Sequence, residues 1–260
     1  MFSINPFAEL SSTVSTISPA IMQTYVIIMI ALVVGGTLFD IVHKKSAKYF
    51  FSNWRKAGEK GSREVGGGEI VGIAVKTAVV EVATSGEFCS MKRRIAHLLT
   101  MYGFIAYIVT TCMMVFATAP TAPIIAQIWW LGAAMICIGG YWFWFFIRVD
   151  VAAEGNSPFR IIRADLFVLS LLASATLGLV WAYLQATGSG LTMVALALYL
   201  LSTSVFFGSV PWSKFAHMFF KPAAAMQKRV AEANGSRSNL PEPADEPEQF
   251  GSARRRPSHY

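Results

Sequence analysis

Four histidines are the side chains in this chain of 260 residues best suited to hold a metal: His43, His97, His217 and His259. His259 lies in a charged terminal segment, whereas the other three stand where long apolar stretches meet basic segments. Two imidazoles that face each other from different helices can ligate the iron of a b-type haem. The sequence therefore offers His97 and His217 as candidate axial ligands of haem iron, with His43 as an alternative ligand. The competing interpretation is that each histidine is an ordinary polar side chain at the membrane interface.

Basic side chains precede both candidate ligands. Arg94 comes three residues before His97, and Lys214 comes three residues before His217. Haem propionates are anionic and form charge-assisted hydrogen bonds with such cations. Arg94 and Lys214 are therefore the candidate propionate partners.

Other redox or hydrolytic chemistry finds no support in the sequence. Cys89, Cys112 and Cys137 form no CxxC pair, and an iron–sulfur cluster needs about four thiolates. The chain has no HExxH motif, and the triplet Gly66-Gly67-Gly68 lacks the spacing of a nucleotide-binding loop.

The composition indicates that these residues belong to a membrane protein. Apolar residues make up 54% of the chain, charged residues 14%, and the mean hydropathy is +0.49. Soluble proteins carry about 25% charged residues. The net charge of +7 could suggest nucleic acid, but the positions of the charges argue against that partner and favour membrane lipid.

Five spanning helices are predicted from the stretches that lack Asp, Glu, Lys and Arg, because a spanning helix needs about 20 apolar residues. Three such stretches occur, and Pro120 with Pro123 divides the second, while Gly188 with Gly190 divides the third. The predicted helices cover residues 21–42, 96–118, 124–147, 165–186 and 191–212. We expect an all-α integral membrane bundle of five helices over residues 21–220, preceded by an external N-terminal segment, 1–20.

The basic residues predict the orientation of this bundle. All 22 Lys and Arg residues fall in the segments 43–96, 148–165 and 214–260. Because cytoplasmic loops carry an excess of these residues, the N-terminus is predicted to lie outside and the C-terminus in the cytoplasm. We therefore expect a multi-pass protein of the inner (cytoplasmic) membrane.

The segments between and after the helices have distinct compositions. The loop 43–95 is too long for a simple connection. Its start, from His43 to Arg55, mixes basic and aromatic residues, as does either a helix at the membrane interface or the flank of a spanning helix. A second surface helix is predicted from Glu69 to Val82. The tail 221–260, rich in Pro and charged residues, is predicted to be disordered.

Two segments around the candidate ligands resemble a known family. The segments Arg94–Phe104 (RIAHLLTMYGF) and Val210–His217 (VPWSKFAH) resemble the nitrate reductase gamma-subunit-like family of membrane cytochromes b, which includes the heterodisulfide reductase E subunit. The segments Thr84–Cys89 and Ser157–Arg160 are most similar to one branch, the membrane anchors of dissimilatory adenylylsulfate reductase in sulfur-oxidising bacteria. The resemblance covers about residues 20–225 and excludes the tail.

This resemblance implies a function and a partner. It implies an electron-transfer subunit that anchors the cytoplasmic adenylylsulfate reductase alpha and beta subunits and links that flavin and iron–sulfur enzyme to the quinone pool. Haem b would be the cofactor and quinone a possible substrate, and a haem-free passive anchor is the alternative. Docking of an acidic partner is expected at basic residues of the cytoplasmic loops. These residues are Lys44, Lys45, Arg55, Arg93 and Arg94.

One departure from the family limits the number of haems. Gamma-subunit cytochromes hold two haems through four histidines, and the second pair would fall at Tyr107 and Tyr199. Tyrosine ligates haem only in special cases. The resemblance therefore implies at most one haem, on the cytoplasmic side.

Overall fold

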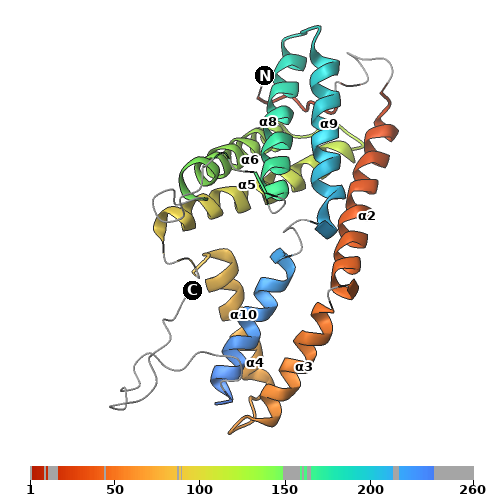
Figure 1. Ribbon diagram of the computed structural model, residues 1–260. Coiled ribbons are helices and arrows are strands. Elements are labelled where there is room, and N and C mark those ends of the chain that lie inside the picture. Colours follow the sequence, from red (N-terminus) through yellow and green to blue (C-terminus); the bar gives the residue numbers. More distant parts are fainter. Residues whose placement is uncertain are drawn as a thin grey trace. The chain divides into compact units, whose positions relative to one another are not determined.

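The computed structural model of the chain describes residues 2–8, 10, 17–43, 45–86, 88, 90–148, 159, 161–162, 165–212 and 217–236. Every regular element in this part of the chain is a helix (Figure 1). The chain divides into two compact units. The bundle unit holds Met1–His43 and Thr84–His217, and the loop unit holds Lys44–Ala83 and Met218–Tyr260.

The bundle unit contains the long apolar helices. They are α2 (Pro19–His43), α5 (Met91–Val115), α6 (Pro123–Trp142) with its π-helical extension η2 (Phe143–Ile147), α8 (Leu166–Ala186) and α9 (Thr192–Gly208). Four of these spans, α2, α5, α6 with η2, and α8, are long and apolar enough to cross a membrane. The fifth helix, α9, is apolar but has 17 residues, and the 3-10 turn η4 (Val210–Trp212) follows it.

Most helix boundaries agree with the sequence-based predictions. The helices predicted at 21–42, 124–147 and 165–186 are confirmed to within two residues. The helix predicted at 96–118 begins earlier, at Met91, because the basic residues assigned to the loop form its first turn. The helix predicted at 191–212 ends at Gly208, where the chain tightens into η4.

Helices α5 and α6 pack backbone against backbone. A Cβ atom added at Gly103 would lie 2.7 Å from the carbonyl oxygen of Gly132, and one added at Gly132 would lie 2.8 Å from that of Gly103. At Gly139 the nearest atom would be the carbonyl oxygen of Ala96, at 2.7 Å. Small residues allow membrane helices to approach this closely. At these levels the two helices therefore leave no room between them for a cofactor.

Helix α9 lies between α8 and α2 (Figure 1). Tyr25 of α2 donates a hydrogen bond to the carbonyl oxygen of Leu200 at 2.9 Å and lies 3.1 Å from the hydroxyl of Ser204. The side chains with the least exposure in this unit include Trp129, Trp181, Ile136 and Phe206. Aromatic rings from several helices thus form the core.

The N-terminal segment packs into one end of the bundle. The sequence predicts only that residues 1–20 are external, but in the structure Phe7 and Leu10 are buried. The Phe7 ring lies 6.0 Å from Trp129 and 5.2 Å from Trp181, centroid to centroid. The side-chain amide of Gln185 donates to the carbonyl oxygen of Pro6 at 2.6 Å. Phe7 and Leu10 are therefore part of the bundle core.

The loop unit contains α3 (Ser46–Glu59), α4 (Gly67–Thr77) with its π-helical extension η1 (Ala78–Ala83), and α10 (His217–Ala233). The range predicted as a helix, Glu69 to Val82, is helical in α4 and η1, and α3 is a separate helix in the segment for which two alternatives were open. The prediction of disorder from residue 221 is wrong for residues 221–233, because α10 continues to Ala233. Contacts with the rest of the unit stabilise α10, including the ion pair of Arg229 with Glu81 at 2.5 Å.

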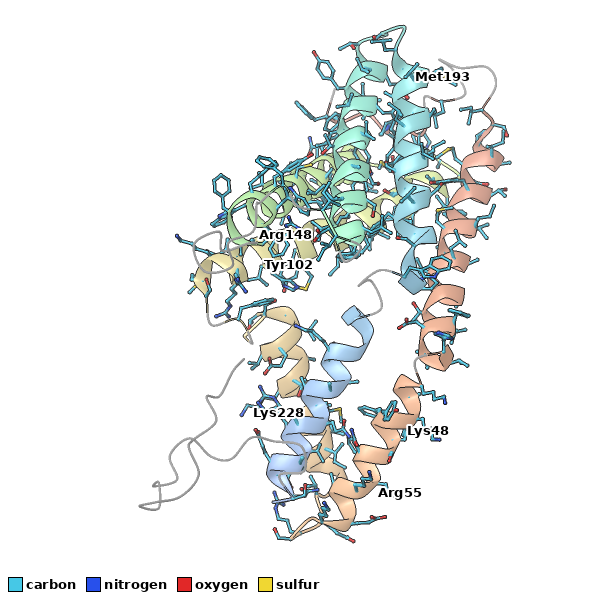
Figure 2. The ribbon with its side chains drawn as sticks, viewed as in Figure 1. Lys48, Arg55, Tyr102, Arg148, Met193 and Lys228 are labelled. Atoms are coloured by element: carbon cyan, nitrogen blue, oxygen red, sulfur yellow. The ribbon has the colours of Figure 1, made fainter. Side chains whose placement is uncertain are left out.

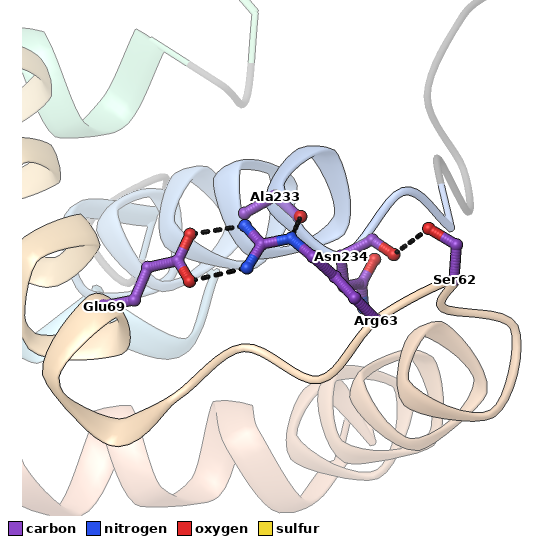
Figure 3. Close-up of polar contacts among 5 residues, drawn as sticks. All are labelled: Ser62, Arg63, Glu69, Ala233 and Asn234. Atoms are coloured by element: carbon purple, nitrogen blue, oxygen red, sulfur yellow. Dashed lines mark hydrogen bonds and ion pairs between the residues drawn. The ribbon is translucent and has the colours of Figure 1, made fainter.

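A network around Arg63 fixes the end of α10 (Figure 3). The guanidinium of Arg63 donates to both carboxylate oxygens of Glu69, at 2.9 and 2.6 Å, and its Nε donates to the carbonyl oxygen of Ala233 at 2.7 Å. The hydroxyl of Ser62 donates to the carbonyl oxygen of Asn234 at 3.2 Å. The last carbonyl groups of a helix lack intrahelical partners, and here the loop before α4 supplies them.

Candidate functional site

His97 lies in the second turn of α5, just after the basic residues Lys92, Arg93 and Arg94. It is the predicted ligand whose surroundings the structure describes most fully. The imidazole is exposed on one side and contacts the preceding loop on the other. We call residues 84–86 and 88, which precede α5, the His97 loop.

The His97 loop holds the imidazole through a buried serine. The hydroxyl oxygen of Ser85 lies 2.9 Å from Nδ1 of His97, and the side chain of Ser85 has no exposed surface. The ring of Phe88 packs on the imidazole at 5.0 Å between centroids. Metal-ligating histidines commonly hydrogen-bond through the ring nitrogen that does not bind the metal. His97 has this arrangement.

The backbone of Ser85 is strained. Its φ angle is +49°, in the left-handed region, where only one other non-glycine residue of the described chain lies, Lys45 at +53°. Such a conformation costs about 1–3 kcal/mol for a residue other than glycine and is frequent at functional sites. The Thr84-Ser85-Gly86 sequence is typical of a turn, but no sequence signal marks Ser85 as the residue in contact with His97.

Arg94, the candidate propionate partner, holds the same loop. Its Nε donates to the carbonyl oxygen of Thr84 at 2.7 Å. Arg93 reaches across to η2, where it donates to the carbonyl oxygen of Ile147 at 3.5 Å. Both guanidinium groups therefore lie at the same end of α5 as His97, and a bound anionic group there would meet positive charge.

The other predicted site residues are described less completely. His43 ends α2, is exposed, and stacks on Phe39 with 5.3 Å between ring centroids. His217 is the first residue of α10, but its side chain lies outside the described residues, as does the whole of Lys214.

The residues proposed for partner docking have different environments. Lys45 and Arg55 are exposed in the loop unit, and Figure 2 labels Arg55 on α3. Arg55 lies 3.8 Å from Glu59, one turn further along this helix. Arg93 is exposed and Arg94 half-buried in the bundle unit. Lys44 is outside the described residues.

The two tyrosines at the expected second ligand positions face each other. Tyr107 of α5 donates its hydroxyl hydrogen to the hydroxyl oxygen of Tyr199 of α9 at 3.0 Å, and both side chains are buried. Trp129 stacks on Tyr107 at 5.1 Å, and Trp181 stacks on Tyr199 at 5.5 Å. These positions therefore carry a packed aromatic core, and their donor set does not fit a haem.

A buried ion pair joins the two ends of the connection between η2 and α8, at the end of the bundle where Arg93 contacts Ile147. Arg148, which follows η2, pairs with Asp165, which precedes α8, and both side chains are 10% exposed. The guanidinium carbon of Arg148 also lies 3.9 Å above the ring of Trp144. A cation over an indole ring is a favourable contact. This pair joins the two helices that the segment 149–164 connects.

The helices and their burial together define the class of protein. Four helices long and apolar enough to span a membrane indicate a multi-pass membrane protein. Comparison with known protein families, curated sequences and solved structures finds no match to this chain.

Proposed function

We propose that this chain is a membrane anchor and electron-transfer subunit that links a cytoplasmic flavin and iron–sulfur enzyme to the quinone pool. The observation that carries the proposal is the environment of His97, an imidazole beside two arginines, whose Nδ1 is hydrogen-bonded to a buried, strained serine. This is the arrangement expected of a haem ligand at the basic end of a spanning helix. When bound, haem b would supply one-electron transfer.

The residues of the chain have separate roles in this proposal. His97 and His217 hold the iron, with His43 as an alternative ligand, and Arg94 and Lys214 bind the propionates. The packed phenol pair of Tyr107 and Tyr199 limits the chain to this one haem. Helix α9 with η4 forms the fifth span, so that the N-terminus lies outside and the basic segments lie in the cytoplasm of a cell with this protein in its inner membrane.

The partner follows from the resemblance of the segments Thr84–Cys89 and Ser157–Arg160 to one branch of the family. We propose the alpha and beta subunits of dissimilatory adenylylsulfate reductase, docked at the exposed basic residues of the cytoplasmic side. The partner then carries out the chemistry of sulfur oxidation, and this chain accepts its electrons and passes them to quinone.

A second candidate function is a passive anchor without haem. The aromatic core around Tyr107 and Tyr199 favours it. The family binds its second haem through histidines at these two positions, and this chain has tyrosines there. The passive anchor would hold the same reductase at the membrane but would carry no electrons.

The test is a reduced-minus-oxidised absorption spectrum of the purified full chain, made with ample haem supply. We expect about one b-type haem per chain, its loss in His97→Ala, and its retention in the matched control His259→Ala. A spectrum unchanged by His97→Ala would contradict the assignment of His97. Protein that binds no haem would favour the passive anchor.

A further inference from the structure

We propose that the exposed side of the helix formed by α4 and η1 inserts into the headgroup layer of an anionic phospholipid membrane. Four valines form this side, and we call them the valine stripe: Val71, Val75, Val79 and Val82. The proposal names phospholipid as the ligand of a surface to which the proposed function gives no role. It depends on neither haem nor quinone.

The valine stripe is a continuous apolar surface. Its members follow one another at intervals of four, four and three residues, which is the spacing of one helix face. Their exposed fractions are 63%, 59%, 52% and 37% in chain order. Single exposed apolar side chains are common, but a row of them on one face marks an interaction site.

The opposite side of the same helix already packs within the loop unit. Thr77 is buried there, and Ile73 and Val80 are half-buried. Glu81 on this side forms its ion pair with Arg229 of α10. The helix is therefore apolar on both sides, and a helix that is apolar all round is normally buried all round. The valine stripe thus requires a second cover.

The charges of the helix favour a negatively charged cover. Its two acidic residues are each paired with an arginine, Glu69 with Arg63 and Glu81 with Arg229. Lys76 is exposed beside the stripe, and a lysine at the edge of an apolar face can extend its ammonium group into lipid headgroups. The segment 44–83 has eight basic and four acidic residues. Anionic lipid attracts such a segment.

The chain keeps this helix within reach of a membrane. The segment that contains α3, α4 and η1 joins α2 to α5, two helices that are long and apolar enough to span a membrane. Two consecutive spans leave and re-enter the membrane at the same surface. Ala83 ends η1 eight residues before Met91 begins α5, so these two residues are at most about 30 Å apart.

The residue types of the stripe favour lipid over a protein partner. The residues that anchor protein interfaces are mostly tryptophan, tyrosine and arginine. The stripe contains none of these, and the residues beside it on the helix include Gly68, Gly72 and Ala78. This aliphatic surface offers a protein partner no side chain to anchor on, whereas mobile acyl chains adapt to it. The reductase subunits and a second copy of this chain are the alternative occupants.

The experiment measures which quencher reaches the stripe. The full chain, without its native cysteines, carries Val75→Cys labelled with the fluorophore NBD and is reconstituted singly in nanodiscs of phosphatidylcholine and phosphatidylglycerol. The quenchers are a spin-labelled phospholipid and aqueous iodide. We expect the lipid quencher to act more strongly at position 75. The same label at Lys60→Cys, which directly follows α3, is the control and should be quenched mainly by iodide.

Paired substitutions test whether the valines hold the helix in the lipid. Val71→Ser with Val79→Ser should lower the ratio of inserted to released helix about fivefold for each valine, because apolar surface is lost. Val71→Leu with Val79→Leu is the matched control and should keep the quenching by lipid. Serine and valine have similar helix propensities, so the serine variant should keep the circular dichroism spectrum of the native chain.

The lipid composition tests the charge of the cover. In nanodiscs of phosphatidylcholine alone, the ratio of inserted to released helix should fall about fivefold, since Lys76 then meets no anionic surface. A ratio that is the same in both lipids would overturn the role of anionic phospholipid.

The remaining results would overturn the proposal as a whole. Quenching by iodide that is as strong at position 75 as at position 60 would show that the stripe faces water. If added reductase subunits then protect the label, the stripe belongs to that partner. Protection that appears only in nanodiscs with two chains would assign the stripe to a second copy. Haem is measured separately by its absorption spectrum, so this proposal and the proposed function can each fail alone.

Discussion

Tyr107 and Tyr199 meet through their hydroxyl groups between α5 and α9, and each phenol ring is covered by an indole. The contact also depends on a glycine of α8. A Cβ added at Gly178 would lie 2.6 Å from the hydroxyl oxygen of Tyr107 and 3.2 Å from the ring of Tyr199. The glycine is therefore the residue that gives the phenol pair its space.

We predict that Gly178→Ala destabilises the chain by about 1–3 kcal/mol through overpacking. The cost should be smaller in a Tyr107→Phe background, because the hydroxyl that the new methyl group meets is then absent. The free energy of unfolding in a denaturing detergent is measured for the native chain, for each single variant and for the double variant. These four values give the coupling between Gly178 and Tyr107. Equal costs of Gly178→Ala in both backgrounds would contradict the predicted contact. The control Gly35→Ala, with no atom within 4 Å of the added Cβ, should be neutral or stabilising by about 0.5–1 kcal/mol.

At the scale of elements, the loop unit depends on contacts between segments that are far apart in the sequence. The Arg63 network joins the loop before α4 to the end of α10, across 170 positions. The hydrogen bonds and charge of Arg63 hold the pKa of the Glu69 carboxyl below its usual value. The charged form of Glu69 is thus favoured in the folded unit.

This shift predicts a pH dependence at the end of α10. Because the pKa of Glu69 is lowered on folding, the stabilisation is fully present above the unfolded value of about 4.3 and is lost as pH falls through the folded value. Amide hydrogen exchange, corrected for its intrinsic pH dependence, should show weaker protection of the last turn of α10 as the pH drops below about 4. Glu69→Gln should show weaker protection at neutral pH and no such transition. A transition that persists in Glu69→Gln would assign it to another group.

The sequence predicts the long helices well because their signal is local. Uninterrupted apolar stretches and the turns at Pro120 and Gly188 determine where the helices of the bundle unit lie. The start of α5 is missed because three cations at a helix N-terminus are unfavourable to the helix dipole and are more typical of a loop. Local composition also fails for α10, whose residues 221–233 become helical beside distant partners such as Glu81.

The candidate site likewise contains residues that the sequence identifies and residues that it misses. Residue type and position identify His97 and Arg94, since histidine and arginine at the basic end of an apolar helix stand out in a single sequence. Ser85 is missed because its left-handed backbone and its contact with His97 follow from the path of the loop, which α5 determines. The contact between Tyr107 and Tyr199 and their packing with two tryptophans are visible only in three dimensions.

At the scale of the whole molecule, the distribution of charge makes a direct prediction about orientation. We predict that the turn between α8 and α9 is external and that the loop unit is cytoplasmic. In a chain without its native cysteines, Thr187→Cys should react with a membrane-impermeant maleimide in intact cells. Lys60→Cys should react only after permeabilisation. Labelling of both positions from the same side would contradict the predicted topology.

The docking of the N-terminal segment has a consequence for how the protein is made. Asn5 and Pro6 are hydrogen-bonded to residues 109 and 179 positions further along the chain. Asn5 and Pro6 therefore reach these native contacts only after α5 and α8 have been synthesised and inserted.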